Sequence, residues 1–484
     1  MDKHLITSRP FLAAFLFLIP AAALRFLALD QQSLWNDELF SIIVAKLPLS
    51  QIPGQLAQSY FHPPVYFALL HFMVEWFGTS EHSLRFLSAL SGSLTVGALF
   101  LITRKLFDDR TAVWAALFCL IAPFHIAYSQ EARPYALAGL LCVLNLFAVW
   151  QAWIRKRSMY YILYTLVTAA AIYTHHWVIF LVAAQAVYVI VDGAIRRESL
   201  KFVLLSYLAL GLLYLPIVGT VLHQTEKVAA SPWWWAEPAS VSHLLRTDLA
   251  FSGAYFKLAS GVFESPLVVK ILLATISFSL LALAVLVGIR RGPRPLQLVL
   301  VSLFGTVTIA FGFSFFRPEA YLWYRYPVIV FPLFCMVLSV GLNLIRRIPL
   351  RLLLAGIYVF LAAMSTFRYY HWEKANAKSV AAFVETVASE RTDLVIRPSY
   401  FQELFNYYYH GKAQQVDEGP FDSTIAPAIR TVDRFVLITL DIPNEVREYI
   451  DAHFEKVVER KFPGEAHMGI VVGVYRKKIS STVP

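Results

Sequence analysis

The sequence is short of charged residues and of cysteine. Only 15% of its 484 residues are Asp, Glu, Lys or Arg, whereas 58% are hydrophobic and the mean hydropathy is +0.58. Soluble chains carry about a quarter charged residues, so this scarcity excludes a soluble enzyme and a disordered chain. The three cysteines, Cys119, Cys142 and Cys335, each lie in an apolar run, which excludes a disulfide-stapled secreted module. The composition predicts a protein that crosses a membrane several times.

Motifs of several common protein classes are also absent. The chain contains no Gly-rich phosphate-binding loop, no G-x-S-x-G and no H-E-x-x-H. These absences argue against an ATP-driven pump and the common hydrolases, and we expect no nucleotide cofactor. The net charge of +10 would suggest a nucleic-acid partner for a soluble protein. In a membrane protein it first indicates basic loops at the cytoplasmic face, so no nucleic acid is expected.

Eleven apolar runs are long enough to cross a bilayer as helices, which takes about 17–25 residues. They cover residues 11–29, 85–103, 112–128, 136–153, 160–174, 177–194, 202–221, 267–288, 297–315, 327–344 and 351–366. The first run follows Lys3 and Arg9, as a cleaved signal peptide would. It continues to Leu29, however, which favours an uncleaved helix.

The segment 64–78 is apolar but only about fifteen residues long, which is typical of an interfacial helix. If the N-terminus is cytoplasmic and this segment is not a span, basic residues concentrate in cytoplasmic loops such as 104–110, 155–157, 196–201 and 290–294. Counting it as a span would move every later loop to the other side and break the positive-inside rule. We therefore expect 64–78 to lie flat on the outer surface as a juxtamembrane helix.

Residues 371–484 differ in character from the rest of the chain. They are polar and mixed in charge, with strand-like runs at 394–396, 435–439 and 469–474 and helical patterns at 375–389 and 443–459. This alternation predicts a small α/β domain. With eleven spans and a cytoplasmic N-terminus, it lies on the extracytoplasmic side.

Unusual polar side chains gather in the outer loops. They are Asp37, Glu38, His62 and Tyr66 in the first loop, Tyr128, Glu131 and Arg133 after the third span, His175 and His176 after the fifth, and Arg317, Arg325 and Tyr326 after the ninth. Each group alone has an ordinary explanation, such as helix capping for the acidic pair, a surface ion pair, or arginines that reach lipid headgroups. Together they predict a site at the membrane boundary.

Transfer from a lipid-linked phosphate would need such a set. The acceptor hydroxyl needs a carboxylate to take its proton, and Asp37 is the candidate base. The leaving phosphate needs cations to hold its charge. The candidates for this role are His62, Arg133, Arg317 and Arg325. Glu131 with His175 or His176 could bind a divalent metal ion, although no ligand spacing in the sequence marks that site.

These residues resemble those of the GT-C polytopic glycosyltransferases, in the bacterial branch related to protein O-mannosyltransferases and the lipid A aminoarabinose transferase. The resemblance covers about residues 1–370. It rests on the acidic pair Asp37–Glu38, H-P-P with a following aromatic (His62 to Tyr66), S-E-H-S-L-R at 80–85, Y-S-Q-E-A-R-P-Y at 128–135, Y-T-H at 173–175 and R-Y-P at 325–327. The aminoarabinose branch carries lysine where this chain has His62, which weakens the case for that particular sugar.

The resemblance implies an α-helical integral membrane protein of the GT-C fold. It would have about eleven transmembrane helices and juxtamembrane helices over residues 1–370, and a small C-terminal α/β soluble domain over 371–484. It also implies a polyprenyl-phosphate sugar donor, such as an undecaprenyl-phosphate hexose or pentose, a lipid, glycan or protein acceptor, and inversion of the anomeric centre. The location implied is a bacterial inner membrane, among membrane lipids, with the C-terminal domain periplasmic.

The resemblance also implies roles for individual residues. Asp37 matches the family's acidic base and Glu38 its supporting neighbour. His62 falls where some relatives carry a basic residue near the lipid phosphate. Glu131 and Arg133 match residues in the second characteristic outer loop of these enzymes.

Two other classes of protein stay open. A transporter or flippase of lipid-linked sugars predicts charges and broken helices near mid-membrane; the sequence offers Arg25 and prolines such as Pro20, Pro123, Pro216 and Pro332. A non-catalytic membrane scaffold would leave the acids and arginines of the outer loops without a role.

Overall fold

The computed structural model describes residues 10–58, 62–230, 240–258, 261–372, 376–397, 400–415, 432–439, 444–462 and 470–478. The chain divides into two compact units. The first unit comprises residues 1–29, 41–257 and 263–371, and the second comprises residues 30–40, 258–262 and 372–484. Each unit is described by itself.

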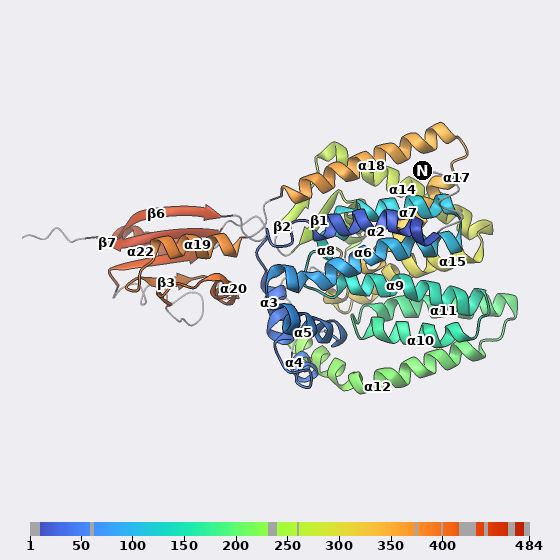
Figure 1. Cartoon of the computed structure of the whole chain (residues 1–484), viewed down its shortest axis with the longest axis horizontal. Helices are drawn as coiled ribbons and strands as arrows, with labels where there is room; N and C mark the ends of the chain where they lie inside the picture. Colours follow the sequence, from blue (N-terminus) through green and yellow to red (C-terminus); the bar gives the residue numbers. More distant parts are fainter. Residues whose placement is uncertain are drawn as a thin grey trace, which may run out of the picture. The chain divides into compact units, whose positions relative to one another are not determined.

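Many long helices run side by side in the first unit (Figure 1), which is built almost entirely from helices of various lengths. They are α2 (Pro10–Phe26), α4 (Ile52–Gln58), α5 (Val65–Phe77), α6 (Glu81–Leu106), α7 (Asp109–Leu120), α8 (Pro123–Ser129), α9 (Tyr135–Val149), α10 (Met159–Ile172), α11 (Val178–Arg196), α12 (Lys201–Ala230), α13 (Val241–Phe251), α14 (Leu267–Arg291), α15 (Arg294–Leu300), α16 (Thr306–Ser314), α17 (Phe331–Leu344) and α18 (Ile348–Tyr370).

Short elements connect or extend these helices. The π-helical turns η1 (Trp150–Ile154) and η2 (Val301–Gly305) continue α9 and α15, and the 3₁₀ turns η3 (Pro318–Ala320) and η4 (Tyr326–Val330) lie between α16 and α17. The strands β1 (Tyr255–Leu258) and β2 (Gly261–Glu264) form a two-stranded sheet. The helix α3 (Asn36–Ala45) begins in the second unit and ends in the first.

The spans confirm an α-helical membrane fold. Among the described residues, eight helical segments are long and apolar enough to cross a membrane, and α7 with α8, bent by 62° at their junction, would make a ninth. The runs predicted at 11–29 and 160–174 form α2 and α10, which have only 17 and 14 residues. Every predicted run therefore contains a helix, and within the described residues eight or nine helical segments, fewer than the eleven expected, have the length and composition of a span.

The helix α5 is the short apolar helix expected at residues 64–78. It has 13 residues and begins directly after Pro64, since a proline with its fixed φ suits the start of a helix. The N–H of Val65 donates to the carbonyl oxygen of Tyr173 at 3.0 Å, so the start of α5 is tied to the end of α10. Its placement flat on a membrane surface stays a prediction.

A buried arginine stabilises the break between α7 and α8. The guanidinium of Arg25 on α2 donates to the carbonyl oxygens of Cys119 at 3.0 Å and Leu120 at 3.4 Å. Its Nη2 also lies 2.9 Å from Nδ1 of His125. These two carbonyls are at the end of α7, where the helix dipole favours a positive charge. Arg25 therefore has a structural role at this bend.

An ion-pair network, here called the Asp192 network, joins the C-terminal end of α11 to the end of η1 and the start of α15. Asp192, near the end of α11, accepts hydrogen bonds from Arg196 Nε at 2.7 Å and Trp153 Nε1 at 2.9 Å, and it pairs with Arg294. Arg294 begins α15 and also donates to Glu198, in the α11–α12 connection, at 3.1 and 3.2 Å. The network thus ties α11 to the end of the α9–η1 segment and to α15.

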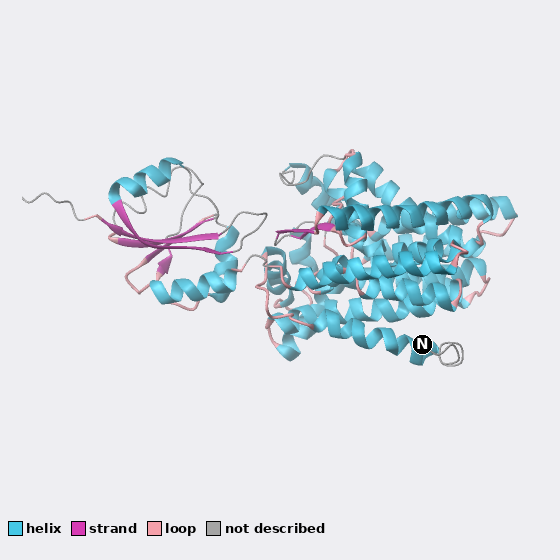
Figure 2. Cartoon of the chain, turned by 90° about the horizontal axis from the view of Figure 1, so that it is seen from above, coloured by secondary structure: helices cyan, strands magenta, loops and turns pink. Residues whose placement is uncertain are grey.

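The second unit contains a five-stranded mixed sheet in the order β4-β3-β5-β7-β6, seen edge-on in magenta in Figure 2. Its elements are α19 (Ala377–Val387), β3 (Asp393–Ile396), α20 (Tyr400–Tyr408), β4 (Gln414–Gln415), β5 (Arg434–Thr439), α22 (Asn444–His453), β6 (Phe454–Phe462) and β7 (Ile470–Lys477). β3 is parallel to β4 and β5, whereas β7 is antiparallel to β5 and β6. The α/β character expected of the C-terminal region is confirmed.

Residues 30–40 belong to the second unit, although they lie near the start of the chain. The N–H of Leu34 donates to the hydroxyl of Tyr408 at 2.8 Å, across 374 positions of sequence. Asp37 and Glu38 follow in the first turn of α3 and are therefore described with this unit.

Candidate active site

The first unit brings Arg133 and His62 into direct contact. Arg133 lies in the turn between α8 and α9 and is 2% exposed. Its Nη2 donates to Nε2 of His62 at 2.7 Å, and its Nη1 donates to Oγ of Ser41 at 3.3 Å. His62 precedes α5 and Ser41 lies on α3, so three distant segments of the sequence meet at one guanidinium.

Further hydrogen bonds hold the backbone of this turn. Oγ of Ser88, on α6, donates to the carbonyl oxygen of Arg133 at 3.1 Å and lies 3.0 Å from the Tyr66 hydroxyl. Both Tyr66 and Ser88 are fully buried. Tyr66, expected to bind substrate, therefore supports the turn that carries Arg133. Ser41 and Ser88 were not found from the sequence, because an uncharged hydroxyl in an apolar helix gives no distinguishing signal.

Four aromatic rings pack together near the α8–α9 turn that carries Arg133. The centre of the Tyr135 ring lies 5.2 Å from that of Tyr128, 5.5 Å from that of His175 and 6.3 Å from that of Tyr326. The rings of His175 and Tyr326 are 5.0 Å apart. These rings come from α8, α9, the α10–α11 turn and η4. The residues expected at the site in these segments therefore converge, and Tyr135 joins them.

Two further charged residues, Arg325 and Glu131, interact electrostatically with this aromatic cluster. Glu131 is 6% exposed, and both residues are electrostatic neighbours of the Tyr128 hydroxyl. Burial, together with the charges of Arg133 and Arg325, lowers the pKa of His62 well below its ordinary value. The cause is that a charged imidazolium would lose its hydration and face two guanidinium groups.

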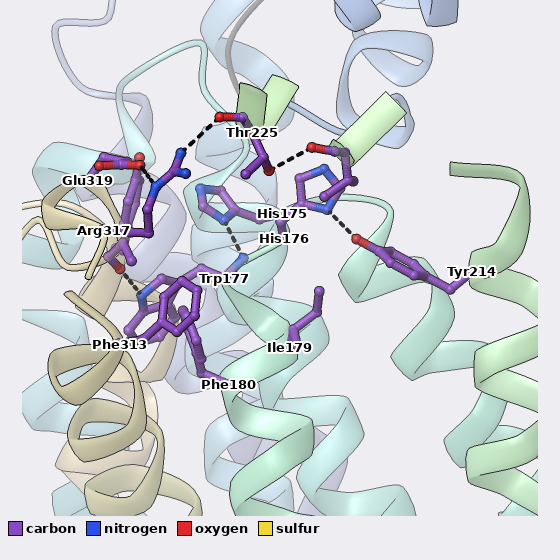
Figure 3. Close-up of a pocket in the computed structure, with 13 residues that line it drawn as sticks. His175, His176, Trp177, Ile179, Phe180, Tyr214, Thr225, Phe313, Arg317 and Glu319 are labelled. Atoms are coloured by element: carbon purple, nitrogen blue, oxygen red, sulfur yellow. Dashed lines mark hydrogen bonds and ion pairs between the residues drawn. The ribbon is translucent and has the colours of Figure 1, made fainter. Parts of the chain in front are cut away.

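A cavity of ≈ 340 Å³ lies beside the aromatic cluster. Its lining (Figure 3) consists of His175, His176, Trp177, Ile179, Phe180, Tyr214, Val221, Thr225, Phe313, Arg317, Glu319, Ala320 and Tyr326. Most of these side chains are aromatic or aliphatic. The cavity therefore suits an apolar group, with a few polar atoms at defined points.

The two histidines of the lining are neutral. Nδ1 of His175 accepts a hydrogen bond from the N–H of Trp177 at 3.2 Å, and Nδ1 of His176 lies 3.3 Å from the Tyr214 hydroxyl (Figure 3). Burial lowers the pKa of His175 to about 3 and that of His176 to about 4. Among the described residues, the buried Nε2 atom of each has no hydrogen-bond partner. Because Nδ1 of His175 is an acceptor, its Nε2 carries a proton that it can donate.

Arg317 is paired within the cavity wall. Its Nε donates to Oε1 of Glu319 at 2.6 Å, and its Nη2 donates to the carbonyl oxygen of Thr225 at 3.2 Å (Figure 3). Because the charge of Arg317 is already compensated by a carboxylate, this guanidinium is less available to an incoming anion.

The three residues expected as metal ligands all lie in the described part of the chain. Among the described residues, which include Glu131, His175 and His176, no three His, Cys, Asp or Glu side chains gather closely enough to hold a metal ion. The metal-binding role expected for this trio stays a prediction. Trp177 and Tyr214 contact the δ nitrogens of the two histidines, and the ε nitrogens are the atoms that could reach an ion.

Asp37 and Glu38 lie in the first turn of α3, where the helix dipole favours their negative charges. Glu38 is fully buried and its N–H donates to the carbonyl oxygen of Trp35 at 2.9 Å, while Asp37 is half-buried. Ser41 follows Asp37 by one helical turn, so these two side chains share a face of α3. The catalytic roles expected for the acidic pair stay predictions.

Comparison with known sequences gives a partial match. A family model described as dolichyl-phosphate-mannose-protein mannosyltransferase matches residues 61–223, about a third of the chain. This segment contains His62, Arg133 and both cavity histidines. A search of curated proteins found no match.

Solved structures match along almost the whole chain. Apo ArnT from Cupriavidus metallidurans has a TM-score of 0.58 at 14% identity, covering 95% of this chain and 97% of that one. The same protein bound to undecaprenyl phosphate has a TM-score of 0.54 at 15% identity, covering 96% and 98%. The archaeal oligosaccharyltransferase AglB from Archaeoglobus fulgidus, in complex with an inhibitory peptide and a dolichol-phosphate, has a TM-score of 0.54 at 13% identity, covering 90% of this chain and 70% of that one. The chain therefore has the GT-C fold of ArnT and AglB, as its motifs predicted.

Proposed function

We propose that this protein is an inverting glycosyltransferase that takes a hexose or pentose from a polyprenyl-phosphate donor. The acceptor is a lipid, glycan or protein at the extracytoplasmic face of a bacterial inner membrane. The observation that carries the proposal is the buried contact of Arg133 with His62 and Ser41 beside an apolar cavity. Two proteins of the same fold have been solved with undecaprenyl phosphate or dolichol-phosphate bound, which supports a lipid phosphate as the ligand.

The phosphate would be held by Arg133 and Arg325. Both guanidinium groups act on the same buried histidine, His62, so positive charge is concentrated where water is scarce. A charged hydrogen bond to phosphate is strong in such surroundings. The apolar cavity would receive the isoprenoid carbons next to the phosphate, while the neutral Nε2–H of His175 can donate to an oxygen of the donor.

Asp37 would act as the general base, with Glu38 as its supporting neighbour. The two residues form the acidic pair of the first outer loop, at the position of the acidic base in the GT-C glycosyltransferases that the sequence resembles. The acceptor oxygen would attack the anomeric carbon as the bond from that carbon to the phosphate oxygen breaks. The acceptor proton passes to Asp37, and the polyprenyl phosphate leaves with the bonding electrons. A single displacement of this kind inverts the anomeric centre.

A transporter of lipid-linked sugars is the second candidate function, and the broken α7–α8 pair favours it. The arginine at that break, however, is bonded to the carbonyl oxygens that end α7, which explains the bend without a transported ion. The two functions differ in whether the sugar–phosphate bond is broken.

Purified protein in lipid nanodiscs, supplied with radiolabelled undecaprenyl-phosphate sugars and envelope extracts, tests the proposal. Transfer with release of undecaprenyl phosphate is expected. Asp37→Asn should lower the rate constant by about 10²–10⁴-fold, and Asp451→Asn, at an exposed position of α22, should leave it unchanged. Movement of labelled lipid across liposomes without bond cleavage would support the transporter instead. An active Asp37→Asn variant would refute the assignment of the base.

A further inference from the structure

The hydrogen bond between Arg133 and His62 fixes the protonation state of the histidine. A guanidinium has five N–H donors and no acceptor. Nε2 of His62, 2.7 Å from Nη2 of Arg133, must therefore offer a lone pair. An imidazolium carries a proton on both ring nitrogens and could not accept this bond. His62 is thus a neutral acceptor, with its proton on Nδ1.

Arg133 depends on such acceptors for its orientation. Its side chain has several rotatable bonds and would lose entropy on being fixed. Two acceptors approach its terminal nitrogens from different segments: Ser41 Oγ at 3.3 Å from α3 and His62 Nε2 at 2.7 Å from the segment before α5. His62 gives the shorter contact. Its own backbone position is set by the two prolines that follow and by the start of α5.

We propose that His62 is a positioning residue, which accepts a hydrogen bond from Arg133 and thereby aims that guanidinium at the donor phosphate. The inference rests on the proposed function and deepens it. It assigns His62 a role different from the one expected from the sequence, in which His62 itself would hold the phosphate as a cation.

The charges around His62 agree with this role. Besides Arg133, the charges of His175, His176 and Arg325 also lower the pKa of His62. A positive charge at position 62 would face the guanidinium of Arg133 at 2.7 Å, which is unfavourable in buried surroundings. A lysine here would offer no acceptor and would repel the arginine that it needs to support.

Binding of radiolabelled undecaprenyl phosphate to the full-length protein in nanodiscs measures the effect without requiring transfer. His62→Leu removes the acceptor at similar volume, and we expect at least about tenfold weaker binding, as for loss of a hydrogen bond to a charged group. His62→Gln, whose amide oxygen can reach the place of Nε2, should recover most of the affinity. His62→Lys should bind no better than His62→Leu. His223→Ala, an exposed histidine on α12, is the matched control.

A double-mutant cycle separates positioning from direct contact. If His62 acts through Arg133, His62→Leu should have little further effect in an Arg133→Ala background, because non-additivity marks residues that act as a unit. The Km for the donor should rise more than kcat falls. Circular dichroism and the thermal unfolding midpoint show which variants remain folded.

Three results would contradict the inference. His62→Lys binding as tightly as wild type would make residue 62 a phosphate-binding cation. If His62→Leu weakens binding of the probe equally in the wild-type and Arg133→Ala backgrounds, His62 contacts the phosphate directly. Equal affinities of His62→Leu and His62→Gln would reduce the role to packing. A wild-type protein that does not bind the probe would instead contradict the proposed function itself, and the inference with it.

Discussion

Gly341 marks a close approach of α17 to α14, and replacing it with alanine tests the packing of these two helices. A Cβ atom at this position would lie 2.0 Å from the carbonyl oxygen of Leu280, 2.7 Å from its carbonyl carbon and 3.1 Å from its Cα. All three atoms belong to the backbone of a helix, so no side-chain rotation can relieve the contact. The two helices must move apart by about 1 Å to restore ordinary separation.

The expected cost follows from that separation. A gap of about 0.5–1 Å forfeits a quarter to a half of the dispersion energy of each facing atom pair. Overpacking of a buried site costs about 1–3 kcal/mol, and a rigid backbone neighbour places Gly341→Ala near the upper end. Alanine regains up to about 1 kcal/mol of helix propensity. Gly356→Ala gains the same propensity on α18, where nothing lies within 4 Å of the added Cβ.

The assay is equilibrium unfolding of both alanine variants in the same detergent, with undecaprenyl phosphate binding measured in parallel. We expect Gly341→Ala to be about 3 kcal/mol less stable than Gly356→Ala, since the propensity gain cancels between them. Donor binding should also weaken, because η4, with Tyr326, leads directly into α17. Two variants of equal stability, within about 0.5 kcal/mol, would refute the reasoning.

Three further predictions concern buried polar groups. In the unfolded chain the two histidines have their ordinary pKa of about 6.5. In the folded protein burial lowers the pKa of His175 to about 3 and that of His176 to about 4. Stability should therefore fall as the pH drops below about 6.5, by about 2 kcal/mol per histidine at pH 5; a thermal midpoint in the His175→Asn/His176→Asn variant that falls just as steeply would contradict this. Asp192→Asn should cost about 2–3 kcal/mol, because it removes the carboxylate that pairs with Arg196 and one of the two carboxylates that pair with Arg294. In denaturant titrations Lys412→Ala, in an exposed ion pair with 80% of its side chain accessible, should cost less than about 0.5 kcal/mol. Arg25→Leu leaves two carbonyl oxygens of α7 unsatisfied and should cost about 3 kcal/mol by the same titrations, with a native-like midpoint as the contrary result.

The helices were predictable because a bilayer demands long apolar runs, and each run of the sequence contains one. The bend inside the predicted run 112–128 was expected only under the transporter hypothesis, which names Pro123 among the prolines that could break a helix. Hydropathy averages over a window and does not register Pro123 at the start of α8. Nor does it register Arg25, which comes from another helix and binds the carbonyls that end α7.

The convergence of His62, Arg133 and Tyr326 was predictable from their positions in outer loops. Their individual roles were not, because a role depends on which atom faces which. His62 was expected as a cation because histidine can carry charge, whereas its geometry makes it an acceptor. The bond between Leu34 and Tyr408 joins positions too distant for any local pattern to connect.

The Asp192 network has a mechanical consequence for the cavity. It holds the C-terminal end of α11, and the cavity histidines His175 and His176 lie just before the N-terminal end of the same helix. With 19 residues and a rise of 1.5 Å per residue, α11 is about 28 Å long. A tilt of about 5° about the network would displace the cavity end by about 2.5 Å. A small angular change of α11 would therefore be enough to change the width of the cavity in which we propose that the lipid binds, with little movement where the ion pairs hold the helices together.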